Sequence, residues 1–183
     1  MQRIFTAVIA ATFLGLAGAA VAANITGDHR KAFYEPILVN YVIADGNLPT
    51  VVVGQPFGAG GNAAMLGSIK LSGDFPTTPL TPTTVQARDG GHLVFVFGPP
   101  ITAHGRHACE APSKLARPAG GGNLRLLAAF CYGDEVVSEA YMEMAKPSGP
   151  ATGEFQQAMG QLLAVLLPPY NPDGGCTNTT IVC

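Results

Sequence analysis

The sequence contains no tryptophan, and only 12% of its 183 residues are charged. Tryptophan is the side chain that most often stacks on sugars, so a carbohydrate contact would depend on tyrosines such as Tyr34, Tyr41 and Tyr132. Ten lysines and arginines stand against twelve aspartates and glutamates, which gives a formal net charge of −2. The chain therefore lacks the basic surplus that binds a phosphate backbone, and we expect no nucleic-acid partner.

The short motifs that accompany common enzyme chemistry are also missing. No serine lies in a G-x-S-x-G or S-x-x-K pattern, and there is no H-E-x-x-H, Walker or EF-hand motif. Residues 58–63 match G-x-G-x-x-A, but Pro56 and Phe57 separate them from the preceding strand-like run. A flexible loop is the better interpretation of this glycine-rich segment. We predict that the protein is not an enzyme and needs no cofactor.

The beginning of the chain differs from everything after it. Arg3 is followed by an apolar stretch, residues 4–23, that contains no ionisable side chain and ends in small residues. This pattern is typical of a cleaved secretory signal peptide. A retained transmembrane helix is the alternative, since about twenty apolar residues just span a bilayer. We predict that residues 1–23 are removed, that no membrane span remains, and that the protein is periplasmic or secreted.

Four cysteines, Cys109, Cys131, Cys176 and Cys183, follow the leader. They form neither a C-x-x-C motif nor a zinc-ribbon spacing, and exported thiols usually pair. Of the three possible connectivities, we favour Cys109–Cys131 and Cys176–Cys183, because each joins near neighbours across a glycine- or asparagine-rich loop. The second bond would close a C-terminal tail at residues 171–183.

Apolar periodicity predicts a single domain at residues 24–170. Strands are expected at residues 37–43, 48–53, 92–97, 124–132 and 136–144. Helices are expected at residues 62–71 and 152–167.

Three of these assignments depend on turn or breaker residues. Residues 44–47 read as the turn of a hairpin, and three prolines in residues 75–84 exclude a central strand there. Residues 136–144 fit a strand or a helix, and we choose the strand because Gly133 permits a hairpin with the preceding run. The predicted fold is α+β: two layers, with a mainly antiparallel sheet of about five strands and two helices on one face.

One cluster of polar residues suggests a metal. His104 and His107 lie three positions apart and are followed by Glu110, while His92 lies on a predicted strand. Imidazole nitrogens are good ligands for zinc and copper. Our main hypothesis is nevertheless a non-catalytic interaction or structural module of the cell envelope or secreted space, whose partner is an envelope protein or a surface polymer. The alternative is a small periplasmic zinc- or copper-binding protein.

Overall fold

The computed structural model describes residues 23–31, 33–71, 73–84, 90–115, 117 and 122–171. All of the predicted signal peptide except Ala23, and the predicted Cys176–Cys183 bond, lie outside these ranges. Within them, no helix combines the length and the apolar character needed to cross a bilayer.

The described residues form seven strands, four α-helices and one 3-10 helix. The strands are β1 (Asn24–Arg30), β2 (Leu48–Val53), β3 (Lys70–Leu71), β4 (Thr78–Pro82), β5 (Gly91–Phe97), β6 (Asn123–Tyr132) and β7 (Glu135–Ala145). The helices are α1 (Pro36–Val42), α2 (Gly61–Ser68), α3 (Gly105–Glu110), the 3-10 helix η1 (Pro112–Leu115) and α4 (Gly153–Leu166).

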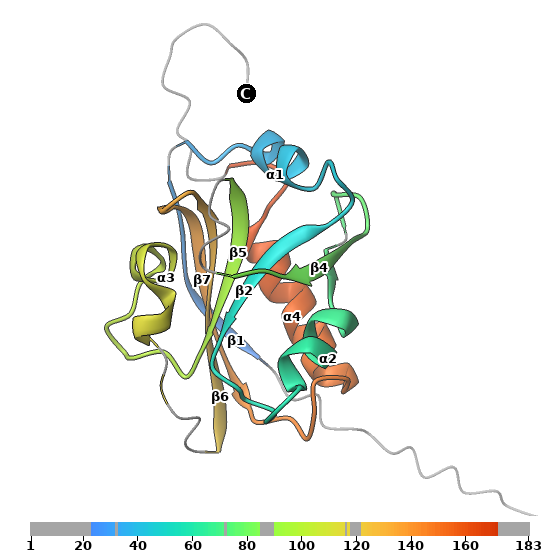
Figure 1. The fold of residues 1–183 in the computed structure, drawn as a ribbon, viewed down its shortest axis with the longest axis vertical. Coiled ribbons are helices and arrows are strands. Elements are labelled where there is room, and N and C mark those ends of the chain that lie inside the picture. Colours follow the sequence, from blue (N-terminus) through green and yellow to red (C-terminus); the bar gives the residue numbers. More distant parts are fainter. Residues whose placement is uncertain are drawn as a thin grey trace, which may run out of the picture.

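The strands form one mixed sheet in the order β1-β7-β6-β5-β2-β4-β3 (Figure 1). The neighbouring pairs β1–β7, β7–β6 and β6–β5 are antiparallel. In contrast, β2 runs parallel to both β5 and β4. The prediction of a mainly antiparallel, five-stranded sheet with two helices on one face is therefore wrong, although α+β remains an adequate class. Helices lie on both faces: α2 and α4 on one, α3 on the other (Figure 1).

The antiparallel centre of the sheet agrees with the sequence. Residues 92–97 of β5 are all buried, as the unbroken apolar run at residues 93–97 predicts. β6 and β7 form the predicted hairpin across Gly133. A bulge in this hairpin moves Val136 to the α3 side, whereas we expected it to share a face with Ala140 and Met142.

The predicted strand at residues 37–43 is instead α1, so the expected hairpin at residues 44–47 is wrong. Pro36 is the first residue of the helix, where its missing N–H costs no hydrogen bond and its fixed φ favours helical geometry. Val39 and Ile43 face the core at a spacing of four, and Leu38 and Val42 are half-buried. The run is rich in β-branched residues, which is why its strand propensity is misleading.

The proline-rich segment also departs from expectation, because β4 lies inside the sheet between β2 and β3. Its pairing with β3 involves only two residues, Lys70 with Pro79 and Leu71 with Thr78. Leu80 and Thr78 point into the core, while Pro79 is exposed. Prolines are tolerated here because the neighbouring ladder is so short.

The predicted helix at 62–71 ends early, at Ser68, and β3 follows it.

The predicted C-terminal helix is α4, and its apolar stripe packs on the sheet as expected. Thr152 is the N-cap residue, but its hydroxyl donates to Gly149 O rather than capping the helix. At the other end, Arg30 donates to Val165 O and Ser138 donates to Leu166 O at 2.7 Å. These side chains satisfy carbonyls that a helix C-terminus leaves without intrahelical partners, and they join α4 to β1 and β7.

Candidate functional site

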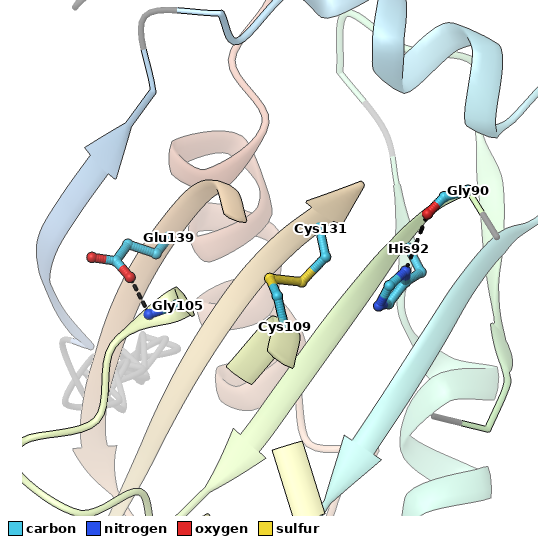
Figure 2. The surroundings of a disulfide bond; sticks show 6 residues. All are labelled: Gly90, His92, Gly105, Cys109, Cys131 and Glu139. Carbon is cyan, nitrogen blue, oxygen red and sulfur yellow. Dashed lines mark hydrogen bonds between the residues drawn. A yellow bond between two sulfur atoms is a disulfide. The ribbon is translucent and has the colours of Figure 1, made fainter. Parts of the chain in front are cut away.

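The predicted disulfide between Cys109 and Cys131 is confirmed. It joins α3 to β6 in the core on the α3 side of the sheet, where both residues are buried (Figure 2). This core also contains Val94, Val96 and Leu127. The bond therefore holds a very short helix against the centre of the sheet.

The N-terminus of α3 carries the two predicted metal ligands. His104 is the N-cap residue, and its backbone N–H donates to His107 Nδ1 at 3.3 Å in a reciprocal capping box. The two ring centroids are 5.8 Å apart. In a neutral imidazole whose Nδ1 accepts a hydrogen bond, the proton is on Nε2. His107 would have to give up this capping bond to ligate a metal, because ligation through Nδ1 uses the accepting lone pair and ligation through Nε2 requires the proton to move to Nδ1.

Two side chains of β7 anchor the same end of α3. The backbone N–H of Gly105 donates to Glu139 Oε2 (Figure 2), which places a carboxylate where the helix dipole favours negative charge. The Tyr141 hydroxyl donates to Ala103 O at 2.6 Å and lies 3.3 Å from His104 Nδ1. Burial, together with the nearby charge of Glu139, raises the pKa of Tyr141 to about 12.

The other two predicted ligands lie elsewhere. The Glu110 carboxylate accepts a hydrogen bond from Arg106 Nε at 2.6 Å on the exposed side of α3. His92 is 3% exposed and its Nδ1 is 3.4 Å from Gly90 O. Figure 2 shows His92 on the far side of the disulfide from Gly105, the residue next to His104. Within the described ranges, no three His, Cys, Asp or Glu side chains are grouped to hold a metal ion.

A different surface stands out at the end of the sheet that α1 crosses. Ile37 and Tyr41 lie one turn apart on α1 and are 71% and 72% exposed. The segment after α4 lies beside the one before α1, because Tyr34 donates to Pro168 O at 2.7 Å and Asn171 donates to Lys31 O at 3.3 Å. These contacts bring exposed Phe33 and Tyr170 to the same end.

Tyr132 completes this group at the end of β6. It pairs with Gly91 in the sheet, and a side chain at Gly91 would collide with Val42 of α1. Side chains alternate along β6, so Tyr132 points to the α1 face like Phe130 two residues before it. We call the exposed residues at this end the α1 patch. It consists of Phe33, Ile37, Tyr41, Tyr132 and Tyr170.

The sequence analysis missed this patch because residues 37–43 were assigned to a strand. The signal that would have found part of it is the i, i+4 spacing of Ile37 and Tyr41 after Pro36. Of the three tyrosines considered for carbohydrate contact, Tyr34 is fully buried, whereas Tyr41 and Tyr132 are exposed.

The structure also contains hollows at both ends of the sheet. One, of about 290 Å³, lies beside the α1 patch and is lined by Tyr41, Val42, Ala44, Asp45, Gly90 and Gly91. The other, of about 240 Å³, lies past the end of β5, where Ile101, Arg125 and Glu143 are among its lining residues.

Comparison of the chain with protein-family models, curated proteins and solved structures found no match. The candidate function below therefore depends on the residues and geometry of this chain alone.

Proposed function

We propose that this chain is an exported, non-catalytic binding protein of the cell envelope or secreted space, and that the α1 patch contacts its partner. The partner is an envelope protein or a surface polymer. Export is supported by the signal-peptide pattern of residues 1–23 and by the buried disulfide, since such bonds persist in oxidising compartments.

One observation supports the proposed binding role. Six large apolar side chains are exposed in the described part of the chain, and all except Ile101 belong to the α1 patch. Single exposed apolar residues are common, but a group of them at one end of a well-packed domain is typical of an interaction surface. Tyrosine is also enriched at interfaces, because it combines a large apolar ring with a polar end.

The test is co-sedimentation of the oxidised mature protein with the envelope fraction of the cells that produce it. Ile37→Glu places a charge in the α1 patch, and Ile101→Glu is the matched control at the opposite end, where Ile101 is 91% exposed. We expect Ile37→Glu to lower the bound fraction about tenfold or more, and Ile101→Glu to leave it unchanged. Equal binding of the two variants would overturn the assignment of the surface.

Export has a separate test in the intact mass of the native protein. We expect a mass that lacks residues 1–23 and includes the disulfide. An intact Met1 with reduced cysteines would contradict export.

Metal binding by His104 and His107 is a second candidate, favoured by the 5.8 Å separation of their rings. It predicts that zinc or copper(II) raises the melting temperature, and that the double variant His104→Ala/His107→Ala abolishes this shift. If neither metal changes the melting temperature of the oxidised protein, this candidate is wrong.

A further inference from the structure

The hollow beside the α1 patch has the composition of a small polar binding site rather than of an apolar groove. Tyr41 and Asp45 supply its large aromatic ring and its carboxylate, and the start of β5 supplies two consecutive glycines. Val42 of α1 occupies the space where a side chain at Gly91 would lie. Val42 therefore packs directly on Gly91, and the hollow lies beside this contact, next to Tyr41 and Asp45.

Tyr132 adds a second aromatic ring close to this hollow. Its strand partner is Gly91, which lines the hollow, and its side chain lies on the same sheet face as α1. Tyr132 is 45% exposed and Tyr41 is 72% exposed, so both present ring surface to solvent. The two tyrosines come from different elements, Tyr41 from α1 and Tyr132 from β6.

The chemistry of these groups selects a class of ligand. An exposed tyrosine ring offers an apolar surface for the C–H groups of a sugar ring, and a carboxylate accepts hydrogen bonds from hydroxyl groups. Among the described residues that line the hollow, Asp45 is the only charged one. A carboxylate that is the only charged group among the described lining residues disfavours phosphate and other anions, which it would repel.

We propose that this hollow binds a neutral sugar unit of an envelope or extracellular polysaccharide, stacked on Tyr41 with Asp45 accepting hydrogen bonds from its hydroxyls. The inference rests on the proposed binding function of the α1 patch and names the partner as a polymer rather than a protein. Tyr132 borders the same site and would contact the neighbouring sugar unit of the chain.

The experiment measures binding of the oxidised mature protein to insoluble cellulose and chitin, with an alginate matrix as the acidic comparison. We expect binding to at least one neutral matrix and not to alginate. Tyr41→Ala should weaken it about tenfold, because the stacking surface is lost. Asp45→Asn should weaken it about fivefold, because a charged acceptor is replaced by a neutral one of the same shape.

Ile101→Ala is the control, since Ile101 is 91% exposed at the opposite end of the sheet and lies outside both the α1 patch and the hollow. It should retain full binding to the neutral matrix. Tyr41 and Asp45 are both exposed, so their variants should keep the melting temperature of the unmodified protein.

Three results would overturn the inference: no binding to cellulose or chitin, binding that Tyr41→Ala and Asp45→Asn leave unchanged, or equal binding to alginate. If the protein binds none of the three matrices while Ile37→Glu still lowers envelope binding, the proposed function stands and its partner is an envelope protein. If Ile37→Glu also has no effect, the α1 patch is not the binding surface.

Discussion

The two faces of the sheet are covered in different ways. On one face, α4 has 14 residues and buries six side chains in the main core. On the other, α3 has only six residues, too few for a stable isolated helix, and is joined to the sheet by a disulfide, by Glu139 and by Tyr141. The long helix is held on the sheet by buried apolar surface, whereas the short one requires a disulfide and individual hydrogen bonds. Substitutions on the two faces should therefore affect stability by different mechanisms.

The largest effect should come from the α4 face. Phe155 is fully buried in the main core, so Phe155→Ala should lower the free energy of unfolding by about 3–5 kcal/mol through lost burial and a residual cavity. Urea denaturation measures this change. Gln156→Ala, at the exposed neighbouring position, is the control and should change stability by less than about 0.5 kcal/mol. Similar losses from the two variants would mean that α4 is not held by its apolar stripe.

The next largest effect should come from the disulfide on the α3 face. Cys109→Ser/Cys131→Ser should cost about 3 kcal/mol, because opening a ring with a sequence separation of 22 gives the unfolded chain more freedom. Urea denaturation with and without dithiothreitol measures it. Reductant should destabilise the unmodified protein by a similar amount, and any further effect on the double variant would come from Cys176 and Cys183. A loss below about 1 kcal/mol would show that α3 stays in place without the bond.

Replacing glycine by alanine should have opposite effects on stability in α3 and in α4. A side chain at Gly105 would lie 2.7 Å from Val136 Cγ2 and against Glu139, so Gly105→Ala should destabilise the protein by about 1–3 kcal/mol. Gly160 in α4 has open space around it, so Gly160→Ala should stabilise it by about 0.5–1 kcal/mol. Melting temperatures of the two variants give the comparison. Stabilisation by Gly105→Ala would show that α3 does not pack closely on β7.

The smallest effect concerns Tyr141, which holds the start of α3. Tyr141→Phe removes the hydrogen bond to Ala103 O and should cost about 1 kcal/mol near neutral pH. The pKa of Tyr141 is raised to about 12 in the folded protein from its ordinary value of 10.0. Its contribution is therefore complete below pH 10 and is lost as the pH rises toward 12, because the unfolded chain loses the proton first.

Burial also raises the pKa of Tyr34, so this tyrosine contributes to the loss of stability at alkaline pH as well. Tyr141→Phe should therefore remove only part of that loss. Urea denaturation at pH values between neutral and about 11 measures this. An identical alkaline slope in Tyr141→Phe and the unmodified protein would contradict the role given to Tyr141.

Local patterns predicted the centre of this fold well. The buried run of β5, the β6–β7 hairpin, α4 and the Cys109–Cys131 bond all follow from residues that are near in sequence. The errors have physical causes of two kinds. The run around Val39 carries strand-forming residues, but Pro36 and core contacts make it a helix. The parallel pairing of β2 with β4 and β5 is non-local, and no residue pattern within either strand specifies it.

The candidate sites show the same contrast between residues that are near in sequence and residues that only the fold brings together. His104 and His107 are near in sequence, and their rings lie side by side at the start of α3. The Glu110 carboxylate instead binds Arg106, and His92 lies on the other side of the disulfide from the start of α3 (Figure 2). The α1 patch combines residues from before α1, from α1 itself, from β6 and from after α4, so it exists only in the folded chain.

The most direct test of the binding role is photo-crosslinking in the producing cells, with benzoylphenylalanine placed at position 37 or at position 101. The binding role predicts a partner adduct at position 37 and none at position 101. Adducts of equal yield at both positions, or an adduct at position 101 alone, would contradict it.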